Sequence, residues 1–126
     1  EEYEAGAIQN FRNILVWMGD RSAQACQRQA SRDAILAVAR LEPTMRSEVY
    51  LQVLKQVSGN PNLRSVRLGW ELMHSLCLET PPPPEIAEFV RAAFRDAAAD
   101  AEGEAAGMAS ACRALLDRPE VKLKLL

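Results

Sequence analysis

Residues 48–70 read EVYLQVLKQVSGNPNLRSVRLGW, two helix-like runs around the break Ser58-Gly59-Asn60-Pro61. Gly59 can adopt the left-handed backbone that ends a helix, and Asn60-Pro61 can cap and open the next one. Apolar residues recur every three or four positions on both sides of the break, at Val49, Val53, Val57, Leu63, Val66, Trp70 and Met73. This spacing gives each run one apolar stripe, so the sequence predicts a helical hairpin.

The order of residue types in this stretch is also specific. A Glu-aliphatic-Tyr-x-Gln-aliphatic-aliphatic-Lys-Gln run leads through an Asn-Pro turn to a Gly-Trp helix. The residues concerned are Glu48, Val49, Tyr50, Gln52, Val53, Leu54, Lys55, Gln56, Asn60, Pro61, Gly69 and Trp70. At these positions the chain resembles the signature of the myosin tail homology 4 (MyTH4) domain, which is found in unconventional myosin tails and in a few other cytoskeletal proteins.

Weaker similarity to the same family extends on both sides of this signature. Residues 11–20, FRNILVWMGD, look like its opening helix and Met-Gly-Asp turn. Ala109, Cys112, Leu115 and Leu116 are similar to its closing helix. Ser47 and Leu68 replace an acidic and a basic residue that many members have, and Pro81–Pro84 replace a Phe-x-Pro-Ser turn. These departures leave the expected fold unchanged, but they weaken any partner contact built on the missing groups.

The composition is that of one globular domain. The chain has 126 residues, 48% of them hydrophobic and 25% charged, which is enough to bury a core. No apolar run approaches the roughly 20 residues that cross a bilayer, and the acidic start has no signal-peptide pattern. Cys26, Cys77 and Cys112 are odd in number and lack metal-ligand spacing, so we interpret them as buried thiols of a reducing, cytoplasmic compartment.

Every periodic segment has the helical period, which predicts an all-α fold: a single compact bundle of about six helices formed by residues 1–126. The signature pair supplies the third and fourth helices. The stripes predicted to face inward in the others are Ile8, Phe11, Leu15 and Met18; Ala30, Ala34, Ile35 and Val38; Ile86, Phe89, Val90 and Phe94; and Met108, Ala111, Cys112, Leu115 and Leu116.

Glycine and proline set the expected boundaries between these helices. The first ends at Gly19, the second spans about residues 22–41 before Pro43, and Pro81–Pro84 form a rigid connector before a fifth helix from Glu85. Residues 96–107 are expected to form a flexible loop, because Gly103 and Gly107 weaken a helix there. The sixth helix is expected to end near Pro119, and the alternating tail, residues 121–126, to form a strand or a docked segment of a longer protein.

Enzyme signatures are absent from the sequence. His74 lies three positions before Cys77, but one histidine and one cysteine cannot hold a structural zinc, and we favour a packed or surface histidine over a catalytic one. No phosphate-binding, dinucleotide-binding or nucleophile motif is present. We therefore expect no catalytic residues, no cofactor and no metal.

Aromatic and acidic residues in the signature have a structural and a functional interpretation. We favour Trp70 and Trp17 as core anchors, and Tyr50 as a core residue with a satisfied hydroxyl rather than a rim contact. Glu48 needs a partner if it is partly buried, and Arg64 or Arg67 on the next helix is the expected ion-pair partner. The alternative is that Glu48 forms the wall of a binding pocket.

Basic residues are concentrated in one part of the chain. From Arg12 to Arg67 there are nine basic and four acidic residues, a net charge of +5, although the whole chain carries −2. A basic surface for an acidic protein segment is therefore a hypothesis, and its candidate residues are Arg28, Arg32, Arg46, Lys55, Arg64 and Arg67. Arg28 and Arg32 are spaced to share a helix face. The overall acidity argues against nucleic-acid binding.

The resemblance implies a non-catalytic interaction module in the tail of a motor or adaptor, usually followed by a FERM domain. Relatives bind microtubules or cargo segments through a basic surface, so the expected partners are a FERM domain in cis and a tubulin tail or cargo peptide. The alternative is a rigid spacer that packs on the FERM domain without a partner of its own. An unconventional myosin fits as the parent protein, as do a pleckstrin-homology adaptor, a plant-type kinesin and a Rho GTPase-activating protein.

Overall fold

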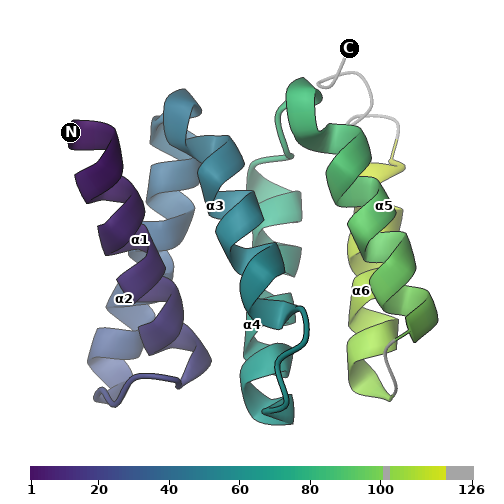
Figure 1. Ribbon diagram of the computed structural model, residues 1–126, viewed down its shortest axis with the longest axis horizontal. Coiled ribbons are helices and arrows are strands. Elements are labelled where there is room, and N and C mark those ends of the chain that lie inside the picture. Colours follow the sequence, from purple (N-terminus) through teal and green to yellow (C-terminus); the bar gives the residue numbers. More distant parts are fainter. Residues whose placement is uncertain (101–102, 119–126) are drawn as a thin grey trace.

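The computed structural model describes residues 1–100 and 103–118, and they contain six α-helices and no strand (Figure 1). The helices are α1 (Glu2–Met18), α2 (Ala25–Leu41), α3 (Pro43–Val57), α4 (Leu63–Glu79), α5 (Pro84–Asp100) and α6 (Glu104–Leu116). The all-α prediction and the number of helices are confirmed. No helix in the described part of the chain is long and apolar enough to cross a membrane.

The six helices form three antiparallel hairpins that stand side by side in two layers. In Figure 1, α1, α3 and α5 form the front layer and run downward, whereas α2, α4 and α6 form the back layer and run upward. The ends of α1, α3 and α5 therefore meet the starts of α2, α4 and α6 at one end of the molecule, which we call the lower end. The packing between layers is close, but within the front layer α3 and α5 barely touch.

Single residues in the sequence set where α1 ends and where α4 begins. Gly19 has a φ of 82° and ends α1 by donating its backbone N–H to the Val16 carbonyl oxygen, as predicted. Gly59 is also left-handed, with a φ of 64°. The prediction that Asn60-Pro61 caps α4 is wrong, because Asn62 caps it and its Oδ1 accepts from the backbone N–H groups of Arg64 and Ser65.

Asn60 organises the turn instead of capping the helix. Its Oδ1 accepts from the Asn62 backbone N–H at 2.9 Å, and its Nδ2 donates to the Gln56 carbonyl oxygen at 3.1 Å. One asparagine side chain thus joins the end of α3 to the cap of α4.

The core lies between the two layers and centres on the signature hairpin. Val49, Val53 and Val57 are buried on α3, and Trp70 is buried on α4, all as predicted. Gly69 has a packing role, since a Cβ atom there would collide with Val57 Cγ1 and would lie 3.0 Å from Met18 Cε. The Gly-Trp pair therefore lets α4 approach α3 and α1 closely while it contributes a large anchor.

The predicted stripes are confirmed in part and wrong in part. The predicted members that are buried are Met18, Ile35, Val90, Phe94, Cys112 and Leu116. Leu63 is 81% exposed and Phe89 is 61% exposed, and Ile8 and Phe11 also face solvent. The side chains that α1 and α2 actually bury are Asn10, Ile14, Met18, Ile35, Leu36 and Ala39. Ala30 and Ala111 are exposed as well. These helices carry apolar residues on more than one side, so the neighbouring helices, and not the period alone, select the buried face.

The expected loop at residues 96–107 is also wrong over much of its length. Helix α5 continues to Asp100 and begins one residue earlier than expected, at Pro84, while α6 begins at Glu104 with Gly107 inside it. Among the described residues of this stretch, only Gly103 has a positive φ, of 62°. The alanines supply enough helix propensity to outweigh the glycine inside α6. Pro119 and the tail, residues 121–126, lie outside the described residues.

Candidate functional site

The signature side chains of α3 fasten α1 to the bundle. Gln52 Nε2 donates to the Ala7 carbonyl oxygen at 3.0 Å and to Glu48 Oε2 at 2.9 Å, and Asn10 Nδ2 donates to Gln52 Oε1 at 2.9 Å. The Tyr3 hydroxyl donates to Glu48 Oε1 at 3.0 Å, and this hydrogen bond raises the pKa of Tyr3. These four contacts give Glu48 and Gln52 a structural role at the α1–α3 junction.

The prediction that Glu48 pairs with Arg64 or Arg67 is therefore wrong. Glu48 lies nine residues before Val57, the end of α3, so in an antiparallel hairpin it lies opposite the middle of α4. Arg64 and Arg67 belong to the first turns of α4, near the lower end of the molecule. The helix lengths alone exclude this pairing.

Tyr50 and Trp70 are core residues, as favoured from the sequence. The buried Tyr50 hydroxyl donates to the Thr80 carbonyl oxygen at 2.7 Å, which fixes the end of α4 before the proline connector. Trp70 meets Phe94 of α5 edge to face, with 5.6 Å between ring centroids. Cys77 and Cys112 are buried beside this layer, but the prediction of a third buried thiol is wrong, because Cys26 is exposed on α2.

Three of the six candidate basic residues make contacts inside the domain. Arg28 and Arg32 share a face of α2, as predicted, with guanidinium carbons 5.2 Å and 5.8 Å from the centroid of the half-buried Trp17 ring. Arg28 also donates to the Trp17 carbonyl oxygen, and Arg32 to Ser75 Oγ. Arg46 donates to the carbonyl oxygens of Ala39 and Arg40 at the end of α2. All three cations therefore stabilise helix contacts or helix ends.

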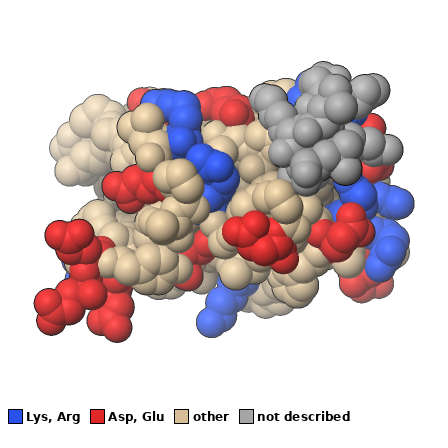
Figure 2. Space-filling model, turned by 90° about the horizontal axis from the view of Figure 1, so that it is seen from above, with Lys and Arg blue, Asp and Glu red and all other residues tan. Residues whose placement is uncertain are grey.

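The other three candidates do not form one patch. Lys55 is exposed on α3 beside Phe11 and Glu48, and Arg67 lies 3.9 Å from Glu71 in an exposed pair that contributes little. Arg64 lies at the start of α4, at the end of the molecule opposite Arg46. Figure 2 looks at the upper end, where basic and acidic side chains are interspersed and acidic ones gather at the start of α1.

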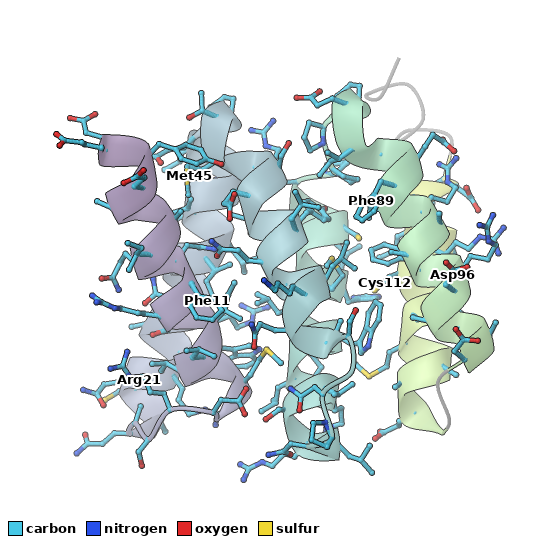
Figure 3. The ribbon with its side chains drawn as sticks, in the orientation of Figure 1. Phe11, Arg21, Met45, Phe89, Asp96 and Cys112 are labelled. Atoms are coloured by element: carbon cyan, nitrogen blue, oxygen red, sulfur yellow. The ribbon has the colours of Figure 1, made fainter. Side chains whose placement is uncertain are left out.

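Arg64 and Arg28 line one groove at the lower end of the molecule, and Arg21 lines it as well. This basic groove has a volume of about 320 Å³ and is lined by Met18, Gly19, Arg21, Ser22, Ala23, Ala25, Arg28, Asn62, Arg64 and Ser65. The buried Ser65 Oγ lies 2.7 Å from Asp20 Oδ1 and 3.0 Å from the Met18 carbonyl oxygen. These contacts hold the α1–α2 loop against α4, so Arg21 (labelled in Figure 3) lines the same groove as Arg64.

A second groove lies between α3 and α5 and has the opposite character. It has a volume of about 560 Å³, and its lining residues are Leu54, Val57, Ser58, Gly59, Val66, Trp70, Phe89, Ala92, Ala93, Asp96, Ala97, Asp100 and Ala105. Asp96 and Asp100 are its only charged lining residues among those described. We call it the apolar groove, and Figure 3 labels Phe89 and Asp96 on α5.

Neither groove contains a catalytic constellation. His74 is half-buried on α4, on the same helix as Cys77. Within residues 1–100 and 103–118, no group of three or more His, Cys, Asp or Glu side chains is placed to hold a metal ion. The described part of the chain is an all-α bundle in which these two grooves lie apart.

Comparison with known proteins identifies the family. The MyTH4 domain profile matches residues 32–124, so the chain belongs to the MyTH4 domain family. The chain is similar to the high molecular weight form of myosin-1 of Acanthamoeba castellanii, with 40% identity over 79 residues. It is also similar to the myosin-I heavy chain of Dictyostelium discoideum and to human unconventional myosin-XVB, with 31% identity over 77 and 71 residues. No solved structure matches the chain significantly.

The matched segments are small parts of these relatives. They cover 63%, 60% and 56% of this chain but only 5%, 3% and 2% of the three myosins, in the same order. The MyTH4 domain is a non-catalytic domain of myosin tails, so the domain itself is not an enzyme. It is an interaction module of the cytoskeletal machinery.

Arg21 and the exposure of Phe89 were missed from the sequence. In an up-and-down bundle the first and third connections lie at the same end, so Arg21 and Arg64 could have been placed together. The apolar groove had no comparable signal, because the period of α5 favours burial of Phe89.

Proposed function

We propose that this MyTH4 domain binds an acidic protein segment, such as a tubulin tail or an acidic cargo peptide, through the basic groove. The observation that carries the proposal is the convergence of Arg21, Arg28 and Arg64 from three separate elements on one groove. The start of α4 adds the positive end of a helix dipole at the same place. Arginine binds carboxylates by two parallel hydrogen bonds, which suits a flexible acidic tail.

This proposal changes the candidate surface inferred from the sequence. Arg21 replaces Arg46, which lies at the opposite end of the molecule. Arg28 can contribute only with the N–H groups that do not contact Trp17. Because the surface is small and its charges face solvent, we expect weak, fast and salt-sensitive binding.

Co-sedimentation with microtubules at low and at physiological salt tests the proposal. We expect the chain to pellet at low salt and less so at physiological salt. The variant R21E/R64E should lose pelleting, whereas the control R95E/R113E, with the same change in net charge on exposed residues of α5 and α6, should keep it. Equal loss in both variants would show that only net charge matters and would contradict a specific groove.

The second candidate function is a rigid spacer that packs on a FERM domain in the parent protein. It is favoured by the contacts that Arg28, Arg32 and Arg46 make inside the domain, which leave Arg32 and Arg46 outside the basic groove and only part of Arg28 for a partner. If the chain does not pellet with microtubules at low salt, the spacer function is favoured over microtubule binding. Fusion to the parent's following segment, compared by limited proteolysis with the isolated chain, would then test the packing.

A further inference from the structure

The apolar groove is not used by the proposed function, and its position needs an explanation. Helices α4 and α6 pack closely in the back layer, whereas α3 and α5 barely touch in front of them. The space left between α3 and α5 is lined by the side chains of the apolar groove. The bundle therefore has an open seam in one layer only.

One face of α5 forms a wall of this seam. Its lining residues recur every three or four positions and so share one helix face: Phe89, Ala92, Ala93, Asp96, Ala97 and Asp100. Phe89 exposes 61% of its surface, and the alanines below it leave room for another backbone to approach. A hydrophobic groove of this kind can accept the apolar face of an amphipathic helix.

The charges on this face are unfavourable in the domain alone. Asp96 and Asp100 are like charges four residues apart, and they lie toward the end of α5, where the helix dipole is negative. The last turn of α5 carries no basic residue. Arg95 Nε lies 3.7 Å from Asp96 Oδ1, but both side chains are largely exposed, so this ion pair offsets little of the repulsion between Asp96 and Asp100. A cation from outside would relieve the repulsion.

We propose that the apolar groove binds an amphipathic helix of another protein, with an aliphatic face and lysine or arginine residues at one end. The aliphatic face would cover Phe89, Leu54 and the edge of Trp70. The basic end would lie beside Asp96 and Asp100. Both recognition elements are on the same face of α5, so a single helix laid along the seam meets both.

Charge complementarity separates this partner from the alternatives. A second copy seated symmetrically would present the same groove lining, which has no Lys or Arg among the described residues to complement Asp96 and Asp100. An acidic tubulin tail and an anionic membrane surface are repelled by these two carboxylates. The two grooves therefore have opposite charge preferences, and one domain can hold two different partners.

A designed peptide provides the test. The probe is a fluorescently labelled helical peptide of about 15 residues, with a leucine face and two lysines four positions apart. The control peptide has glutamates in place of the two lysines. Binding to the 126-residue chain is followed by fluorescence anisotropy. We expect the lysine peptide to bind, and the glutamate peptide to bind about tenfold more weakly or not at all.

Variants of the chain then locate the site. F89A and D96K/D100K should each weaken binding of the lysine peptide by about tenfold, because each removes one of the two recognition elements. The control E2K/E4K makes the same change in net charge on α1, away from the groove, and should bind as the wild type does. Phe89, Asp96 and Asp100 are exposed, so these variants should fold, and circular dichroism checks this.

Three results would overturn the proposal. Equal binding of the two peptides would exclude charge recognition, and equal loss in E2K/E4K and D96K/D100K would place the effect on net charge. A concentration-dependent dimer that disappears in F89A would assign the groove to a second copy. None of these results depends on microtubule binding, so this test is separate from that of the basic groove.

Discussion

Helix α3 has two sides that are built in different ways. Toward α1 it carries Glu48 and Gln52, whose polar atoms are joined to Tyr3, Ala7 and Asn10 by hydrogen bonds. On another side it carries the buried Leu54 and Val57, which line the apolar groove between α3 and α5. Polar groups that are partly buried must be paired in the domain itself, so the first side fixes the helix positions. The second side has no polar groups that need such pairing, which is why we propose that a partner helix covers it.

The largest expected effect is at Trp70, which lines the groove from the core. We expect W70A to lower the free energy of unfolding by about 3–5 kcal/mol, because a large buried side chain is removed and Phe94 loses its ring contact. Urea unfolding followed by circular dichroism measures this loss. If W70A lowers the free energy of unfolding by less than about 1 kcal/mol, Trp70 is not a core residue, and the apolar groove extends into the bundle.

The second effect probes the polar side of α3. We expect Q52L to lower the free energy of unfolding by about 2 kcal/mol, because Glu48, Asn10 and the Ala7 carbonyl each lose a partner. The control is Q29L, which removes an exposed hydrogen bond to Asp33 on α2 and should change stability by less than about 0.5 kcal/mol. Equal effects in the two variants would contradict a structural role for the α1–α3 contacts.

The residues of this comparison show what could be predicted from the sequence. The hairpin of α3 and α4 was predictable because its signals are local: the valine repeat, the left-handed Gly59 and the Gly-Trp pair. The exposure of Leu63 and Phe89 was not, since it depends on which neighbours happen to cover a helix with apolar residues on several sides. Helices α5 and α6 extend into the expected loop because its alanines have high helix propensity. The loop prediction gave too much weight to Gly103 and Gly107.

The candidate site was predictable only in part. The shared face of Arg28 and Arg32 follows from helix geometry, but their stacking on Trp17 depends on how α1 and α2 pack. The convergence of Arg21 with Arg64 follows from the up-and-down order of the helices. Simple antiparallel arithmetic also excludes the Glu48 pairing.

A third, smaller effect concerns Tyr50, which fixes the end of α4 on the closed side of the bundle. We expect Y50F to lower the free energy of unfolding at pH 7 by about 1 kcal/mol, because the Thr80 carbonyl oxygen loses its buried donor. Urea unfolding of the two proteins measures the difference.

The same variant also carries a pH signature. Burial, followed by the nearby Cys77, raises the pKa of Tyr50 above its ordinary value of 10.0, so the native hydroxyl stays neutral while the unfolded one ionises. The raised native pKa means that its stabilising effect is complete below about pH 10 and declines as the pH rises above that value. Wild type should therefore lose more stability than Y50F between pH 7 and about pH 11. The raised pKa of Cys112 acts in the same direction in both proteins and cancels in the difference. A constant difference across this range would contradict the buried hydroxyl.

The smallest expected effect is at Phe89, on the open side. We expect F89A to change the free energy of unfolding by less than about 0.5 kcal/mol, since most of the ring already faces water, and L63A provides the matched control for an exposed apolar side chain. Only F89A should also weaken the lysine peptide. A residue that contributes little to folding but much to binding is the mark of a surface kept open for a partner. A loss of stability in F89A as large as that in Q52L would instead show that α5 depends on this ring, and that both sides of α3 are structural.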